Sequence, residues 1–422
     1  MYKLLIFILF LLTILYNYYN KRLASSSSMW VFCYVLIFVI YPLYNKDIIF
    51  SNEKTIDIFA LLGIIMFFIG LTFGSRIVIK TNRNFKKNLK EVSNFYVACC
   101  CFFIFLVISL IILIRKIQIS GIISILNGSF TSKKFALEHD NSSSAFVFSV
   151  HLLVPCLLSI WMSSNTKKEK KISIFCLILY LIVNLFFVFT RIFMISVIAI
   201  ILIHEIRNKN NFKQLIFLSS GVIILVVFMI LLNFIRTFGL GTEISASNLL
   251  DFSYVFESTD FGASYYWFDE LLNYKSPFIN PIVYFKPFFA FIPRFIWQNK
   301  PEPLSLQILK YINPTLAARG YSTAGNSILG EGYSVASYFG MLLYPFLWGM
   351  ICGKFDKSYY RRLKYKGKTS LKDIYYYIFE VFIIISCQRG DWSQYMTVVI
   401  WFYIVPLYLM SKVSSKLCNN SN

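Results

Sequence analysis

The chain has 422 residues, of which 57% are hydrophobic and 14% are charged, and its formal net charge is +21. Soluble domains are about 45 to 50% apolar and about 25% charged. The apolar residues also gather in runs of roughly 16 to 24, the length that crosses a bilayer core. The composition therefore excludes a soluble globular protein and predicts an all-α polytopic membrane protein.

About eleven transmembrane helices are predicted by the apolar runs between charge clusters. Arg191 separates two nearly continuous runs, which we interpret as a tight helical hairpin with Arg191 at its turn. The expected spans are residues 2–19, 29–45, 56–79, 94–114, 145–163, 172–190, 192–206, 214–235, 329–353, 373–388 and 394–411.

The positive charge follows the loops between the spans. Basic residues concentrate in alternate loops, as in the cluster from Lys167 to Lys171 and the stretch from Lys354 to Lys372. Such loops stay in the cytoplasm, so the C-terminus is expected inside and, with an odd span count, the N-terminus outside. No nucleic-acid partner is expected, because the charge has a topological explanation.

The first run is expected to be a retained spanning helix. Only Lys3 precedes it, whereas Lys21 and Arg22 follow it. A cleaved signal peptide carries its positive charge in front of the apolar run.

Three parts divide the chain: a first transmembrane bundle (1–236, about eight helices), a large outer loop (237–328) and a final set of about three helices (329–422). A loop longer than about 15 residues is uncommon unless it has a function. Within it, residues 279–297 are apolar but interrupted by Pro281, Pro287 and Pro293. We expect this stretch to lie in the membrane interface or to re-enter the membrane rather than to cross it straight.

Five arginines are expected at or near the outer face, where the positive-inside rule should deplete them: Arg191, Arg236, Arg294, Arg319 and Arg389. A guanidinium group stays ionised and can bind two phosphate oxygens at once through a bidentate hydrogen bond, which suits a pyrophosphate at the membrane surface. The alternative is that each pairs with a nearby acid or reaches lipid headgroups.

Two carboxylates, Glu331 and Asp391, are the strongest candidates for a general base, because each lies at a helix end beside an expected arginine. The acids of the outer loop, such as Asp269 and Glu270, are interpreted as solvated surface groups. Tyr266, Trp267 and Trp297 either stack on sugar rings or anchor the outer loop at the interface.

No cofactor and no metal are expected. The nine cysteines and three histidines show no metal-ligand spacing. The sequence has no Walker loop and no G-x-G-x-x-G, so nothing indicates a nucleotide-linked donor.

The layout resembles a family, the O-antigen or oligosaccharide repeat-unit polymerases (Wzy). Locally the resemblance rests on the arginine of Thr190-Arg191-Ile192, the run from Phe291 to Trp297 followed by Lys300-Pro301, the loop-to-helix segment from Ser322 through Gly330-Glu331-Gly332-Tyr333, and Arg389-Gly390 before the last span.

The resemblance implies a GT-C-like glycosyltransferase of the bacterial inner membrane. Its substrates would be oligosaccharides linked to undecaprenyl pyrophosphate at the outer face, and its partners would be membrane lipids, a chain-length regulator and a flippase. The five arginines would then hold the pyrophosphates, and Glu331 or Asp391 would deprotonate the acceptor hydroxyl.

Three other functions remain open at this point: a flippase or other transporter of the lipid-linked unit, an O-antigen ligase, and a purely structural membrane protein, which leaves the arginines and the long loop without an explanation. A transporter predicts about twelve spans in two similar halves. A ligase predicts a catalytic histidine in the long outer loop, where this sequence has none.

Overall fold

The computed structural model of the chain describes residues 1–20, 22–23, 25–45, 49–77, 95–120, 148–187, 191–207, 213–214, 216, 260–274, 279–289, 292, 296–318, 325–364 and 371–420. Within these ranges all regular structure is helical and there is no strand. The prediction of an all-α membrane protein is confirmed at this level.

The helices follow one another along the chain with short π- or 3₁₀-helical segments, labelled η, between some of them. They are α1 (Tyr2–Tyr19), α2 (Ser26–Val35), η1 (Leu36–Ile40), α3 (Tyr41–Tyr44), α4 (Glu53–Arg76), α5 (Phe95–Ser120), η3 (Phe148–Leu152), α9 (Leu153–Ser163), α10 (Lys167–Phe187), α11 (Arg191–Arg207), α15 (Asp260–Asn273), η4 (Pro281–Phe285), α16 (Lys286–Phe289), α17 (Leu304–Ile312), α18 (Pro314–Ala318), α19 (Ser327–Lys364), α20 (Leu371–Arg389), α21 (Trp392–Val398), η5 (Val399–Ile404) and α22 (Val405–Asn420).

Five helical stretches in the described residues are long and apolar enough to cross a membrane: Tyr2–Tyr19, Ser26–Tyr44, Glu53–Arg76, Ser327–Arg361 and Tyr395–Lys416. They coincide with five of the predicted spans. The predicted spans at 94–114, 145–163, 172–190, 192–206 and 373–388 also correspond to helices. Most of the span at 214–235 lies outside the described residues, so the total of eleven stays a prediction.

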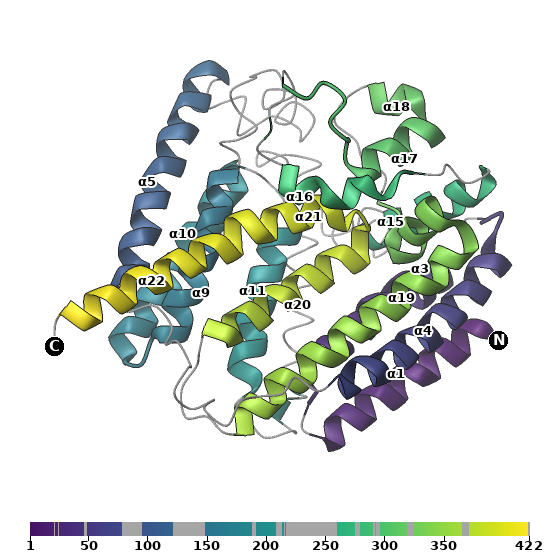
Figure 1. Ribbon diagram of the computed structural model, residues 1–422, viewed down its shortest axis with the longest axis horizontal. Helices are drawn as coiled ribbons and strands as arrows, with labels where there is room; N and C mark the ends of the chain where they lie inside the picture. Colours follow the sequence, from purple (N-terminus) through teal and green to yellow (C-terminus); the bar gives the residue numbers. More distant parts are fainter. Residues whose placement is uncertain are drawn as a thin grey trace, which may run out of the picture.

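The helices form two groups joined by α11 and α20 (Figure 1). One group contains α1, α2, α4 and α19, and the other contains α5, α9, α10 and α22. The described helices α15 to α18, which belong to the predicted outer loop, gather at one end of the bundle, beside the start of α19 and the turn from α20 to α21 (Figure 1). That end holds both predicted carboxylates.

Helices α4 and α19 run parallel in direct backbone contact. A Cβ atom added to Gly70 would lie 2.0 Å from the carbonyl oxygen of Phe346, and one added to Gly349 would lie 2.0 Å from that of Phe67. Each helix contributes two glycines four residues apart to this contact, Gly70 and Gly74 on α4 and Gly349 and Gly353 on α19. This is the small-x-x-x-small spacing that lets helices approach closely in lipid. The parallel direction agrees with the predicted order, in which both helices cross the membrane the same way.

Two aspartates fasten distant helices together by accepting hydrogen bonds at helix N-termini. Asp356 of α19 accepts the backbone N–H groups of Ser26 (3.0 Å) and Ser27 (3.2 Å) at the start of α2. Asp269 of α15 accepts the N–H groups of Ser51 (3.2 Å) and Asn52 (2.8 Å), directly before α4. Such N–H groups have no partner within their own helix, so an anionic acceptor is strongly favoured there.

The position of Asp269 corrects one sequence interpretation. Asp269 is only 5% exposed, so it is not the solvated surface group that the loop composition suggested. Asp269 instead holds the outer-loop helix α15 against the membrane bundle.

The predicted span 329–353 is helical but not straight. Ala336 (φ −140°, ψ 26°) and Ser337 (φ 53°, ψ −146°) interrupt α19, leaving a half-helix of residues 327–335 before the long segment of residues 338–364. The two parts touch through their glycines, because a Cβ atom on Gly332 would lie 2.3 Å from the carbonyl oxygen of Gly340. The carbonyl oxygen of Ser334, freed by the break, accepts the N–H of Ile279 (3.0 Å) from the outer loop.

Replacing Gly349 with leucine should prevent α4 and α19 from packing. The new side chain would meet the Phe67 backbone, which cannot move aside as a flexible side chain can, so we expect a loss of about 3 kcal/mol of stability. Size-exclusion chromatography of detergent-solubilised protein should show aggregate in place of a single peak. Leu347→Phe, at a position 41% exposed on the same helix, is the control; a wild-type profile for Gly349→Leu would contradict the packing described.

Candidate functional site

Glu331 lies in the half-helix of α19 and is only 3% exposed. Its carboxylate accepts a long hydrogen bond from the backbone N–H of Trp392 (3.4 Å), and the N–H of Asp391 also donates to it. Its third donor is the hydroxyl of Tyr284, which comes from the outer loop. A carboxylate buried to this degree requires such partners, and here they come from two separate parts of the chain, the turn between α20 and α21 and the segment of Tyr284.

Tyr284 of η4 connects Glu331 to a second phenol. The hydroxyl of Tyr344, on the long segment of α19, donates to that of Tyr284. Burial, and then the nearby Glu331 carboxylate, raise the pKa of Tyr284 far above its usual range. Tyr284 therefore stays protonated at ordinary pH, and it has a hydrogen to donate to Glu331 at all times.

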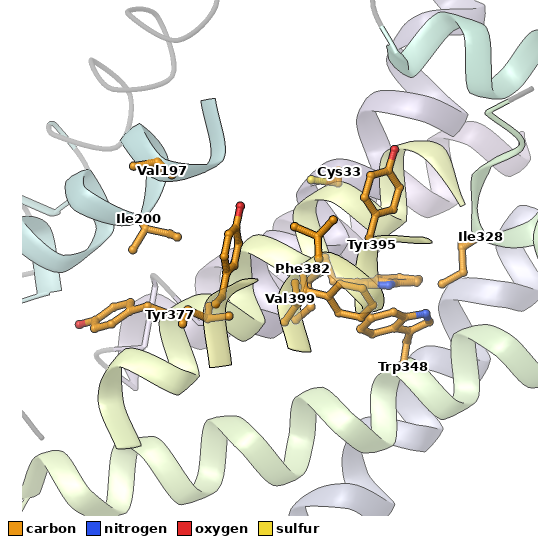
Figure 2. Close-up of a cluster of buried hydrophobic side chains, with 14 of the residues drawn as sticks. Cys33, Val197, Ile200, Ile328, Trp348, Tyr377, Phe382, Tyr395 and Val399 are labelled. Carbon is orange, nitrogen blue, oxygen red and sulfur yellow. The ribbon is translucent and has the colours of Figure 1, made fainter. Parts of the chain in front are cut away.

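A column of aromatic rings connects Tyr284 to the apolar core of the protein. The rings of Tyr284 and Trp392 meet edge to face with their centroids 5.8 Å apart, and Trp392 meets Trp348 in the same way at 5.6 Å. Trp348 then packs on Phe382 of α20 (5.5 Å). Figure 2 shows Trp348 and Phe382 within the buried apolar cluster, with Val399 and Tyr395 beside them. The polar groups around Glu331 thus pack against a rigid set of apolar side chains.

Asp391, the second predicted carboxylate, lies in the turn between α20 and α21 and is 3% exposed. One of its oxygens accepts the backbone N–H (3.2 Å) and the hydroxyl (2.6 Å) of Ser305 at the start of α17. The other accepts the hydroxyl of Ser393 (2.7 Å). Asp391 is therefore a third aspartate bound to a helix N-terminus, and its contacts position α17 rather than present a free base.

Unusual backbone conformations concentrate around the two carboxylates. Among the described residues, positive φ angles occur at Ser327 (58°), Ser337 (53°), Gly390 (65°) and Asp391 (53°). The first two bracket the half-helix that carries Glu331, and the others form the turn beside it. Serine and aspartate adopt this region at an energetic cost, and such strain is found preferentially at functional sites.

Gly390 has a steric role as well as a conformational one. A Cβ atom at this position would lie 2.9 Å from the carbonyl oxygen of Ser327 and 3.4 Å from a carboxylate oxygen of Glu331. A larger residue would push the α20–α21 turn away from Glu331. The sequence Arg389-Gly390, which carried part of the family resemblance, thus places a backbone directly against the buried carboxylate.

Asn326 precedes Ser327 at the start of α19 and is 2% exposed. Neither its amide nitrogen nor its carbonyl oxygen finds a protein partner in the described part of the chain. Buried polar atoms usually have partners. Asn326 is thus a second buried polar group next to the Glu331 site, at the start of the same half-helix.

The five predicted arginines are only partly covered by the described residues. Arg389 is the last residue of α20, so its backbone lies next to Gly390 and the Glu331 site, and Arg191 is the first residue of α11. The side chains of both lie outside the described residues, as do Arg236, Arg294 and Arg319 entirely. Their assembly into one phosphate-binding group stays a prediction.

The predicted aromatic residues lie on two outer-loop segments. Tyr266 of α15 is 43% exposed and its ring meets that of Trp267, which is half-buried, at 5.4 Å. Burial, and then the charges of Glu270 and Asp269, raise the pKa of Tyr266. Trp297 is half-buried against Phe289 of α16 at 5.2 Å. The exposed Tyr266 ring is the one of the three most open to a sugar.

No group of three or more histidine, cysteine, aspartate or glutamate side chains in the described ranges could hold a metal ion. The groups around Glu331 are hydroxyl and N–H donors, which suit proton transfer and hydrogen bonding to sugars. Sequence reasoning missed Tyr284 and Tyr344 because tyrosines are abundant in this chain, 28 in all. The one usable signal was the position of Tyr284 within the interrupted segment 279–297.

Asp391→Ala should loosen α17 by leaving the buried Ser305 N–H and hydroxyl without their acceptor. We expect a loss of about 2 kcal/mol, seen as a lower unfolding temperature in detergent. Asp391→Asn keeps an acceptor oxygen and tolerates positive φ, so it should retain more of the stability. Glu302→Ala, which removes only the pair with Lys310 (2.7 Å), is the control and should cost under about 1 kcal/mol. Equal stability of the alanine variant and the wild type would contradict the role given to Asp391.

Comparisons with known proteins leave the family open. No family model matches the chain, no curated protein matches it, and no solved structure matches it. The apolar helices of the chain mark it as membrane-embedded.

Proposed function

We propose that the protein is a membrane glycosyltransferase that polymerises a surface polysaccharide. It would join oligosaccharide repeat units carried on undecaprenyl pyrophosphate at the outer face of the bacterial inner membrane, with its N-terminus outside and its C-terminus in the cytoplasm. This is the activity of the O-antigen polymerases, which the sequence resembles. A chain-length regulator and a flippase would be its partners.

The observation that carries the proposal is the buried Glu331 carboxylate, beside the Arg389-Gly390 turn at the end of the bundle where the outer-loop helices gather. A general base must be held in place and kept from bulk water. Three hydrogen-bond donors and the column of aromatic rings do this for Glu331. Asp391, the alternative base, has its oxygens occupied by Ser305 and Ser393, so Glu331 is preferred.

The reaction forms one bond and breaks one. The acceptor sugar hydroxyl attacks the anomeric carbon of the donor, and the bond between that carbon and the pyrophosphate oxygen breaks. The hydroxyl proton passes to Glu331, and undecaprenyl pyrophosphate leaves with the electron pair. The arginines would stabilise the charge that develops on the leaving group, which makes the step possible without a metal ion.

A transporter of the lipid-linked unit is the second candidate, because two observations favour it. Helix α19 is interrupted at Ala336 and Ser337, and interrupted helices form the substrate sites of many transporters. Glu380, 0% exposed on α20, is an ionisable group within a predicted span, where such groups usually serve a function. A transporter and a polymerase differ in which product is lost from cells.

Cells that produce Glu331→Gln or Arg389→Ala in place of the wild type should lose the polysaccharide ladder but keep a single repeat unit on its acceptor. The first change removes the base and the second removes a pyrophosphate ligand. Gel electrophoresis of the extracted polysaccharide measures both. Arg361→Ala, at an exposed arginine near the far end of α19, is the control and should leave the ladder intact.

Two results would contradict the assignment as a polysaccharide polymerase. A full-length ladder from correctly inserted Glu331→Gln and Arg389→Ala proteins would exclude the proposed chemistry. Loss of even the single repeat unit would indicate transport or ligation in place of polymerisation.

A further inference from the structure

The buried position of the Glu331 carboxylate keeps a sugar hydroxyl from reaching it directly. At 3% exposure, its carboxylate is enclosed by its own half-helix, the Gly390–Asp391 turn and η4. A sugar hydroxyl is attached to a bulky ring and cannot enter so closed a space. A base that is to remove the proton of that hydroxyl needs either direct contact or an intermediate group within hydrogen-bonding reach.

The structure provides a continuous chain of hydroxyl groups leading away from Glu331. Tyr284 donates to the carboxylate, and Tyr344 donates to Tyr284. Both tyrosines are half-buried, in contrast to Glu331. Each hydroxyl in the chain is at once a donor to the next group and an acceptor for the one before it. The chain therefore has a direction, from the partly exposed Tyr344 to the buried carboxylate.

Several contacts hold η4, the segment of Tyr284, in place. Asn280 accepts the N–H of Ile282 (3.0 Å) with its side chain and so begins the segment. Ile279 donates to Ser334 at the break in α19 (3.0 Å), and the indole N–H of Trp401 donates to the carbonyl oxygen of Pro287 (2.7 Å). These bonds fix the segment at both of its ends. Tyr284 is thus held on a rigid support, as proton transfer requires.

We propose that Tyr344 and Tyr284 relay the proton of the acceptor hydroxyl to Glu331. The acceptor hydroxyl donates its proton to the Tyr344 oxygen as it attacks the donor sugar. Tyr344 passes its own proton to Tyr284, and Tyr284 passes its own to Glu331. One proton leaves the acceptor and one arrives at the carboxylate. Both phenols end protonated, with their O–H bonds turned toward the acceptor side, and they rotate back before the next turnover. This inference rests on the proposed function, because it assigns two further residues to the same reaction.

The break in α19 gives the relay its geometry. Glu331 and Tyr344 belong to the same helix, but on opposite sides of the interruption at Ala336 and Ser337. In an uninterrupted helix, thirteen residues would separate them by roughly 20 Å. The break folds the half-helix back so that a single tyrosine, Tyr284, bridges them. The strained Ser337 conformation therefore has a use in the relay.

The test compares single hydroxyl deletions in the full-length protein reconstituted into lipid vesicles. The substrate is the lipid-linked oligosaccharide fraction extracted from cells that lack this protein. Tyr284→Phe and Tyr344→Phe each keep the ring and remove only the hydroxyl. Tyr338→Phe is the matched control, because Tyr338 is on the same helix but 49% exposed and stacked on Phe59 (5.2 Å). Polymer formation gives kcat and KM, and the unfolding temperature of each variant is measured alongside.

Each relay variant should lower kcat on the order of 100-fold, as expected when general base catalysis is impaired, while KM stays within about threefold. The combined variant with Glu331→Gln should be no slower than Glu331→Gln alone, because groups that act as a unit are not additive. In a proton inventory, kcat is plotted against the mole fraction of heavy water in the solvent. For the wild type this plot should be curved, since several protons move together. That dependence should become linear in Tyr284→Phe, a change that a merely structural tyrosine would not cause.

Other outcomes separate the relay from the proposed function. Inactive Glu331→Gln with fully active Tyr284→Phe and Tyr344→Phe would overturn the relay and leave the polymerase assignment standing. A lower unfolding temperature with unchanged kcat in the relay variants would show that the two tyrosines only stabilise the fold, and it would likewise overturn the relay. No polymer from the wild-type protein under conditions that support insertion would overturn the proposed function, and the relay with it.

Discussion

The structure depends above all on aspartate carboxylates bound to the N-termini of helices that are distant in sequence. Asp356 binds the start of α2, Asp269 the start of α4 and Asp391 the start of α17. The first N–H groups of a helix have no partner within their own helix, and where they are buried they need an acceptor from elsewhere in the protein. Each aspartate supplies one together with its negative charge. The same interaction therefore holds membrane helices and helices of the predicted outer loop in place, and one of the three aspartates, Asp391, lies directly beside the Glu331 site.

The sequence predicted the membrane character and many of the helices because apolar run length and loop charge are local signals. It also predicted that Glu331 and Asp391 would each lie at a helix end, and the structure brings the two together. It could not distinguish their roles, because the difference arises from Ser305, which is far away in the chain and reaches Asp391 only after α17 has packed. The break at Ser337 and the pairing of Tyr284 with Tyr344 were unpredictable for the same reason: both depend on contacts across the fold. Asp269 was misinterpreted because a loop acid resembles a surface acid until its helix partner is known.

The Glu331 site combines features that are usually costly to a protein. It has a deeply buried carboxylate, residues with positive φ on both sides of it, and an interrupted membrane helix. Each of these lowers stability on its own. Their coincidence at the end of the bundle where the outer loop packs is easier to reconcile with selection for chemistry than with selection for stability. The aromatic column of Tyr284, Trp392 and Trp348 offsets part of this cost by fixing the site to the apolar core.

The glycine contact between α4 and α19 has a consequence for biosynthesis. The ribosome completes α4 early and α19 only after most of the chain has been made, an interval of roughly tens of seconds at ordinary translation rates. During that time the glycine face of α4 lacks the partner that it has in the folded protein. The contact forms only when α19 inserts, and α20 to α22 still follow it. A nascent chain in which α19 pairs poorly therefore stays incompletely assembled, and quality-control proteases have longer to remove it.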